Sequence, residues 1–236
     1  MEVEKVTDHI VKWLKDYAIK AGAKGYVLGI SGGIDSAVTS TLCAMTGLEV
    51  LCVEMPIHQA ENQVSRAEEH IKQLKNRFSN VSEARVNLTS TFEDFKNVLP
   101  EAEISTKLDV SLANTRARLR MTTLYYFAGL HGLLVAGTGN KVEDFGVGFY
   151  TKYGDGGVDV SPIADLLKSE VYAVGKHLNV PQSILKAAPS DGLYEAEKTD
   201  EDQIGATYDE LEKAMYHADI NAPLVNLNDR EKEVLE

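Results

Sequence analysis

The sequence has little cysteine, no long apolar run and no excess of basic residues. Two cysteines, Cys43 and Cys52, are too few for a disulfide scaffold or a zinc site, and they indicate buried thiols in a reducing cytoplasm. No apolar run approaches the ~18 residues that a membrane span requires, so we expect no membrane association. The formal net charge of −12 argues against nonspecific nucleic-acid binding, which requires a basic surface.

What is present is the composition of an ordinary globular protein, with 44% hydrophobic and 25% charged residues. A length of 236 residues predicts a single domain, residues 1–236. The first twenty residues have the pattern of an amphipathic helix that carries acids, which is not the pattern of a signal or transit peptide. We therefore expect a cytoplasmic protein.

Short apolar segments alternate with helical patterns along the chain. The segments that we predict to be strands are 26–30, 49–55, 83–88 and 133–137. The helical patterns cover 2–20, 35–45, 60–77, 89–99, 111–130, 164–178, 200–217 and 228–236. Such alternation predicts an α/β fold, in which a parallel sheet lies between layers of helices. The stretch 138–163 is rich in glycine, aromatic and charged residues and shows no periodicity, which is typical of a functional or mobile segment.

The stretch LGISGGIDSAV, residues 28–38, joins the first predicted strand to a helix. At such a turn the unpaired N–H groups and the dipole of the helix favour an anion. Gly32 and Gly33 let the backbone approach phosphate oxygens, and Ser31 and Ser36 supply hydroxyl donors. The lysine of a GxxxxGK[ST] loop is missing, and the spacing does not fit GxGxxG. The turn therefore predicts a phosphate site of another kind.

An acid inside an anion-binding turn repels phosphate unless a cation lies between them. Asp35 occupies this position, and Mg²⁺ prefers one or two carboxylates together with phosphate oxygens. We therefore predict Mg²⁺ between Asp35 and a phosphate group. The competing interpretation is a serine-capped glycine turn followed by an ordinary acid in the first turn of a helix.

SGGIDS resembles the SGGxDS loop of the adenine nucleotide alpha hydrolase-like superfamily, the N-type ATP pyrophosphatases. These enzymes use this loop to hold the diphosphate that leaves ATP. The resemblance implies a Rossmann-like, three-layer fold. Four further stretches look like the ammonia-dependent NAD synthetases of that superfamily. They are 114–121 (NTRARLRM), 137–178, 188–194 (APSDGLY) and 199–211 (TDEDQIGATYDEL).

Members of this family are ligases that form a C–N bond at the last step of NAD⁺ biosynthesis. The nicotinate carboxylate of deamido-NAD⁺ attacks the α-phosphate of ATP, which releases diphosphate, and ammonia then displaces AMP. The resemblance implies Asp35 and Glu143 as Mg²⁺ ligands, and Asp155 and Lys168 as catalytic residues. It assigns ATP binding to Gly29, Ile30, Ser31, Gly32, Gly33, Ile34, Asp35, Ser36, Thr138, Lys168 and Ser190, and deamido-NAD⁺ binding to Arg118, Phe149, Lys152 and Asp159.

Several of these residues also have structural explanations. Asp155, which the resemblance implies to act near ammonia, fits a turn aspartate between glycines equally well. Phe149 fits a packing anchor as well as a partner that stacks on the nicotinate ring. Arg116 and Arg120 are four residues apart and share a helix face that Arg118 does not, so we interpret them as salt-bridge or subunit contacts.

The family implies a homodimer with the dinucleotide bound across the interface, and the long helix 111–130, apolar on several faces, is consistent with a shared or a buried helix. Only 28 residues precede Gly29, too few for a glutaminase domain, so we expect free ammonia, or ammonia from a separate protein, as the nitrogen source. The chain departs from the family at Glu54, where arginine is common. It also lacks the carboxyl-terminal His-Lys pair, and its length differs by one residue near 145–148.

Two alternatives share parts of this pattern. Another ATP pyrophosphatase ligase, such as the GMP synthetase core or an asparagine synthetase-like domain, would have the same loop. A nucleotide-binding module without catalysis would have the same fold, but it needs no pair of metal-binding carboxylates.

Overall fold

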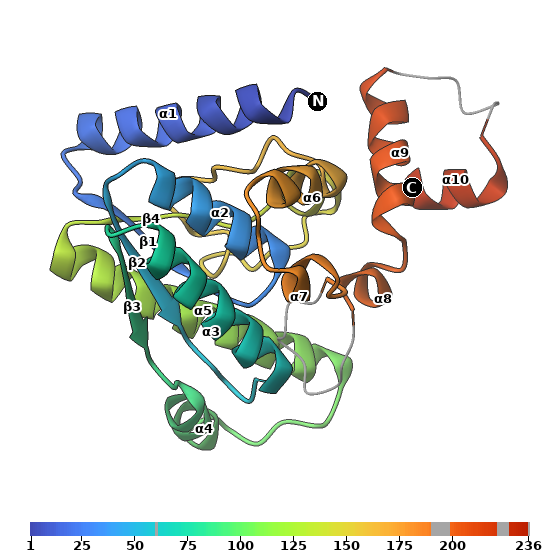
Figure 1. The fold of residues 1–236 in the computed structure, drawn as a ribbon. Coiled ribbons are helices and arrows are strands. Elements are labelled where there is room, and N and C mark those ends of the chain that lie inside the picture. The colour runs from blue at the N-terminus through green and yellow to red at the C-terminus, as the bar shows by residue number, and fades with distance from the viewer. Residues whose placement is uncertain (60, 190–198, 221–226, 236) are drawn as a thin grey trace.

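A parallel sheet forms the centre of the molecule (Figure 1). The structure is a computed structural model that describes residues 1–59, 61–189, 199–220 and 227–235. Its strands are β1 (Gly25–Gly29), β2 (Glu49–Glu54), β3 (Val81–Arg85) and β4 (Leu134–Val135), in the order β3-β2-β1-β4. Tyr26 of β1 lies opposite Val50 of β2 on one side and Leu134 of β4 on the other.

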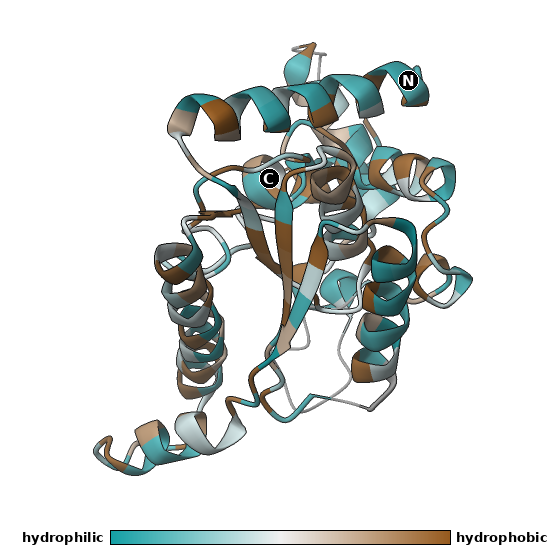
Figure 2. Cartoon of the chain, turned by 60° about the vertical axis from the view of Figure 1, so that its left-hand side comes forward, coloured by the Kyte–Doolittle hydropathy of each residue, from teal (hydrophilic) through white to brown (hydrophobic). Residues whose placement is uncertain are grey.

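Helices cover both faces of the sheet, which confirms the predicted three-layer α/β fold. One face packs against α1 (Val3–Ala21), α2 (Ile34–Met45), α3 (Glu61–Arg77) and α6 (Lys168–His177). The other face packs against α4 (Thr89–Asn97) and α5 (Thr106–His131). Strands covered on both sides are largely apolar, and Figure 2 shows brown residues in the strands between the helices, whereas the edge strand β3 is mostly polar.

The carboxyl-terminal part of the chain adds short helices beside this core. They are the π-helix η1 (Val142–Val147), α7 (Gln182–Leu185), α8 (Asp200–Ile204), α9 (Tyr208–Asp219) and α10 (Asp229–Leu235). In Figure 1, α9 and α10 lie at the margin of the molecule, beyond α6 and α8. Among the described residues, no helix is both long enough and apolar enough to cross a bilayer.

The structure corrects several predicted boundaries. The third strand spans Val81–Arg85 and not 83–88, because its partner β2 ends at Glu54, just before Pro56. The helix predicted over 200–217 is two helices, which Gly205 separates with a left-handed φ of 83°. The fourth strand is shorter than 133–137, although Ala136 continues it as an isolated bridge to Val160. The stretch after residue 137 also contains regular structure, namely the π-helix.

Candidate active site

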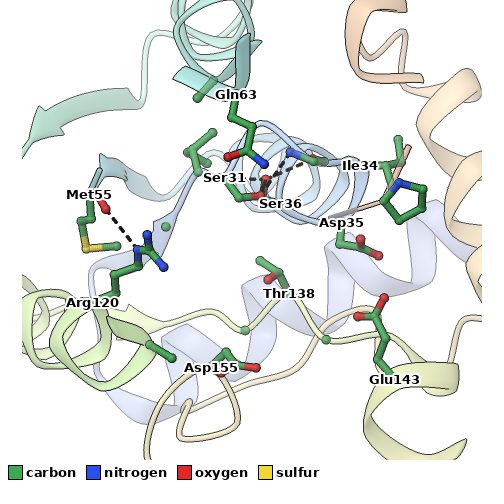
Figure 3. Close-up of a pocket in the computed structure, with 18 of the residues that line it drawn as sticks. Ser31, Ile34, Asp35, Ser36, Met55, Gln63, Arg120, Thr138, Glu143 and Asp155 are labelled. Carbon is green, nitrogen blue, oxygen red and sulfur yellow. Dashed lines mark hydrogen bonds between the residues drawn. The ribbon is translucent and has the colours of Figure 1, made fainter. Parts of the chain in front are cut away.

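A cleft opens at the carboxyl ends of β1 and β4 (Figure 3). The chain leaves β1 toward β2 and β3 on one side and returns to β4 on the other, so the loops after β1 and β4 diverge here. Ligands of open α/β sheets bind at such switch points. The SGGIDS loop, the segment from Ala136 to Gly139, and side chains of α5 and α6 line the cleft.

The loop after β1 is shaped by its own serines. Ser31 Oγ and Ser36 Oγ lie 3.1 Å apart, Gly33 N–H donates to Ser31 Oγ at 3.2 Å, and Ser36 Oγ donates to the Gly33 carbonyl at 3.1 Å. No side chain caps the amino terminus of α2, at Gly33. Gly33, Ile34 and Asp35 line the cleft, so the amino terminus of α2 lies at the cleft, where a helix end would favour an anion.

Gly32 is required by the backbone and by its neighbour α3. Its φ is +81°, and a Cβ at this position would lie 2.5 Å from the Gln63 carbonyl oxygen. Arg66 Nε donates to the Gly32 carbonyl at 3.1 Å, which fixes the loop from the same helix. The sequence analysis assigned no role to Arg66, because no local pattern links two residues that lie 34 positions apart.

A buried ammonium group lies between two carboxylates at one end of the cleft. Lys168 Nζ donates to Asp35 Oδ2 at 2.7 Å and to Glu143 Oε1 at 2.9 Å, and its side chain is only 3% exposed. Burial alone would lower the pKa of Lys168, but the two carboxylates outweigh it and raise that pKa above its ordinary value. Burial and the charge of Asp35 raise the pKa of Glu143, and Lys168 opposes this shift.

This arrangement fits a divalent cation that is shared with a phosphate ligand. Asp35 and Glu143 point toward each other in Figure 3 and already bind one positive group between them. Among the residues that the structure describes, no group of three or more His, Cys, Asp or Glu side chains could hold a metal ion. A pair of carboxylates matches Mg²⁺, which takes its remaining ligands from water and phosphate.

Asn140 is a site residue that the sequence analysis missed. It is fully buried, and its Nδ2 donates to Asp35 Oδ1 at 3.0 Å. Its Oδ1 accepts the N–H groups of Val142 at 3.1 Å and Glu143 at 3.2 Å, at the start of η1. One amide therefore connects the Asp35 carboxylate to the backbone of Glu143. An asparagine just before a helical segment is a capping signal that can be recognised in the sequence. Its contact with Asp35 spans 105 positions and cannot be recognised there.

The opposite wall of the cleft contains Arg120, which we had interpreted as a salt-bridge or subunit contact. Arg120 Nε donates to the Met55 carbonyl at 3.1 Å, and its Nη2 donates to Gln59 Oε1 at 2.7 Å. Glu54, at the end of β2, also lines this wall, and burial raises the pKa of its carboxyl group. Arg116 instead lies over the Phe92 ring, 4.5 Å from its centroid.

Three other predicted residues line the cleft. Thr138 follows β4, and Phe149 and Asp155 come from the segment beyond η1. Asp155 Oδ1 also accepts the Thr151 N–H at 3.1 Å, so this residue is a turn aspartate and a cleft residue at once.

The residues predicted to bind deamido-NAD⁺ through charge lie on the exposed surface, and they are not part of the cleft wall. Arg118 Nε donates to the Lys152 carbonyl at 3.0 Å. Asp159 Oδ2 accepts the Val135 N–H at 2.8 Å, and its Oδ1 accepts the Tyr125 hydroxyl at 3.0 Å. The predicted ATP contact Ser190 lies outside the described residues.

Comparison with known proteins agrees with this geometry. The family model described as NAD synthase matches residues 6–235. An NH(3)-dependent NAD(+) synthetase of Methanococcoides burtonii is 40% identical over 224 residues, which are 91% of this chain and 80% of that protein. The structure of an NMN synthetase from Francisella tularensis has a TM-score of 0.85 and 32% identity, covering 100% of this chain and 92% of that one.

A second solved structure, an NH3-dependent NAD synthetase from Campylobacter jejuni, has a TM-score of 0.79 and 28% identity, covering 100% of this chain and 92% of that one. The family model, which spans nearly all of the sequence, and the curated relative both lead to the same conclusion. The chain belongs to the NAD synthase family.

Proposed function

We propose that this chain is an ammonia-dependent NAD⁺ synthetase, a ligase that forms a C–N bond. A carboxylate oxygen on the nicotinate ring of deamido-NAD⁺ attacks the α-phosphorus of ATP, and the bond to the β-phosphate breaks to release diphosphate. Ammonia then attacks the carbonyl carbon of the adenylate, AMP leaves, and a proton is lost to give the carboxamide of NAD⁺. The observation that carries this proposal is the Asp35–Lys168–Glu143 group beside an open helix end in a member of the NAD synthase family.

The amino terminus of α2 would bind the phosphate groups of ATP. Gly33 and Asp35 at this helix end line the cleft, and Lys168, which also lines it, supplies a positive charge. Mg²⁺ held by Asp35 and Glu143 would neutralise charge on the phosphates. Asn140 would orient the Asp35 carboxylate and hold the backbone at Glu143 before any ligand arrives, which would lower the cost of arranging the site during the reaction.

The segment beyond β4 would receive the nicotinate and ammonia. Phe149 offers a ring face for the nicotinate, Asp155 a carboxylate for ammonium, and Thr138 a hydroxyl for ATP. Arg118, Lys152 and Asp159 would hold the rest of the dinucleotide outside the cleft, which is consistent with a substrate that extends toward a second subunit. We propose a homodimer on this basis. We also propose a cytoplasmic location, which rests on the composition and the two cysteines expected to be reduced.

A second candidate is amidation of the mononucleotide of nicotinic acid. The observation that favours it is the fold likeness to an NMN synthetase, whose TM-score of 0.85 exceeds the 0.79 of the NAD synthetase from Campylobacter jejuni. Both substrates present the same nicotinate carboxylate, so the cleft chemistry is shared and the two differ only in the adenylyl half.

One assay separates these possibilities. The protein is incubated with MgATP, ammonium and either deamido-NAD⁺ or nicotinic acid mononucleotide, and NAD⁺, NMN, AMP and diphosphate are quantified by chromatography. Glutamine replaces ammonium in a parallel series. We expect one AMP per NAD⁺ with ammonium only, and a kcat/KM for the dinucleotide that exceeds that for the mononucleotide. The opposite preference would establish the second candidate, and diphosphate release without either product would indicate another acid substrate.

A further inference from the structure

The segment from Thr199 to Glu212 has no part in the reaction described so far, yet it reaches the charged centre. It contains α8 and the start of α9, separated by Gly205. A capping box begins each helix, with Thr199 and Asp202 at α8 and Thr207 and Glu210 at α9. These boxes fix where each helix starts, and Tyr208 is therefore held as the first residue of α9.

The Tyr208 hydroxyl donates to Glu143 Oε1 at 2.6 Å. This is the same oxygen that accepts from Lys168 Nζ at 2.9 Å. The ring of Tyr208 also contacts the ammonium group, since Lys168 Nζ lies 4.7 Å from the ring centroid. Tyr208 is only 6% exposed and is thus shielded from competition by water. It touches both the proposed metal ligand and the buried cation.

The hydroxyl has a second acceptor at a longer distance. Asp200 Oδ2 lies 3.4 Å from the Tyr208 oxygen. A phenol has one proton to donate, so the shorter contact with Glu143 takes most of it.

Glu143 needs such support because of the element that carries it. It lies in η1, a π-helix of six residues, and segments of this kind occur mostly as single turns. Contacts from outside so short a segment help to fix its side chains. The hydroxyl of Tyr208 approaches Glu143 from α9, outside η1.

Helix α9 also contacts the first turn of α6, which carries Lys168. Glu212 accepts the Ser169 N–H at 2.8 Å and the Ser169 hydroxyl at 2.7 Å, in the first turn of α6. That turn begins with Lys168. One helix therefore contacts both η1 and the start of α6.

We propose that Tyr208 is a positioning residue, whose hydroxyl orients the Glu143 carboxylate for the metal of the reaction. The inference rests on the proposed metal role of Glu143. Partners that hydrogen-bond to a metal ligand change metal affinity by about 10- to 100-fold. Loss of the hydroxyl should therefore weaken metal binding more than it weakens binding of the nicotinate substrate.

The test compares Tyr208→Phe with the wild-type protein. The variant keeps the ring over Lys168 and removes only the oxygen. Tyr216→Phe on the same helix, whose side chain is 64% exposed, is the matched control. Mn²⁺ binding is measured by the electron paramagnetic resonance signal of the free ion, with α,β-methylene-ATP present so that no turnover occurs. Thermal unfolding is followed without metal.

We expect Tyr208→Phe to raise the Kd for Mn²⁺ about tenfold and to raise the Mg²⁺ concentration for half-maximal NAD⁺ formation by a similar factor. The KM for deamido-NAD⁺ should be unchanged, and Tyr216→Phe should match the wild type. An unchanged Kd for Mn²⁺ would overturn the inference, and so would loss of the folded state, since the hydroxyl would then be a structural group. Because Mn²⁺ binding requires no product, a wild-type protein that makes no NAD⁺ would refute the proposed function separately.

Discussion

His70 provides a sharp test of how burial controls charge in this fold. It lies on α3, is completely buried, and its Nε2 is 2.8 Å from Ser40 Oγ on α2. Ser40 Oγ donates its own proton to the Ala37 carbonyl at 3.1 Å, so it accepts from Nε2. Among the described residues Nδ1 has no partner. A second proton on the ring would therefore add a charge and an unsatisfied donor to the core.

The magnitude follows from the shift in pKa. Burial, with a contribution from the nearby charge of Arg77, lowers the pKa of His70 from 6.5 to about 4. Between these two pH values the unfolded chain binds a proton that the folded chain does not. The free energy of unfolding is therefore unaffected by the titration of His70 above pH 6.5 and falls as the pH is lowered below it. The full difference of 2.5 units corresponds to roughly 3.4 kcal/mol. Between pH 7.5 and pH 5.0, about 2 kcal/mol of it is lost.

The assay is urea unfolding followed by circular dichroism from pH 7.5 to pH 5.0, on the wild type and on His70→Gln. Other groups titrate in this range. Asp144, whose pKa is raised to about 6 mainly by burial, contributes with the opposite sign, because a raised pKa favours the fold at low pH. Such contributions are the same in the wild type and in His70→Gln, so they cancel when the two free energies of unfolding are subtracted.

The free energy of unfolding of the wild type, relative to His70→Gln, should therefore fall by about 2 kcal/mol from pH 7.5 to pH 5.0. His9→Gln, at an exposed position on α1, is the control and should follow the wild type across the range. Parallel curves for the wild type and His70→Gln would refute the reasoning, since the folded protein would then accept the proton without cost.

The remaining predictions concern packing and catalysis. Gly175→Ala should lower the free energy of unfolding by about 1–3 kcal/mol, because its Cβ would lie 2.7 Å from a side-chain carbon of α2. Gly129→Ala in α5, where a Cβ meets nothing within 4 Å, should instead raise it by about 0.5–1 kcal/mol in the same urea titration. Lys152→Ala should raise the KM for deamido-NAD⁺ about tenfold and leave that for ATP unchanged in steady-state kinetics. An equal change in both would remove this assignment. Asp35→Asn and Glu143→Gln should each slow diphosphate release about 100-fold or more while a cooperative melting transition persists, and release at the normal rate in either variant would contradict the metal role.

The parts of the fold that local pattern encodes could be predicted from the sequence. The strand–turn–helix around SGGIDS was predicted in the correct order, because glycine and serine act on the backbone next to them. The break at Gly205 was not predicted, because the helical pattern over 200–217 is continuous. A capping-box pattern on each side of Gly205 is the signal in the sequence that could have revealed it. The edge strand β3 was displaced by two residues at its start, because only Val81 in it is buried and the apolar pattern is weak.

The contacts that assemble the site could not be predicted in this way. Asp35 meets Lys168 across 133 positions and Asn140 across 105, and no periodicity carries such information. The resemblance to a family supplied the identity of Glu143 and Lys168 but not their shared contact with Tyr208. It also named Arg118, Lys152 and Asp159 without indicating that they lie outside the cleft. Helix spacing gives the face on which Arg120 lies but not what that face meets, so its contacts with Met55 and Gln59 could not be predicted.

The lysine between the two carboxylates means that the folded chain carries its own counter-ion. Proteins whose folds are built around a structural metal unfold when a chelator removes it. Here the ammonium group already neutralises one of the two buried negative charges, and Asn140 binds the other side of Asp35. If Asp35 and Glu143 bind Mg²⁺ as proposed, the folded chain would not depend on that ion, which could bind and leave together with the nucleotide. Magnesium depletion would then lower the activity of this chain without unfolding it.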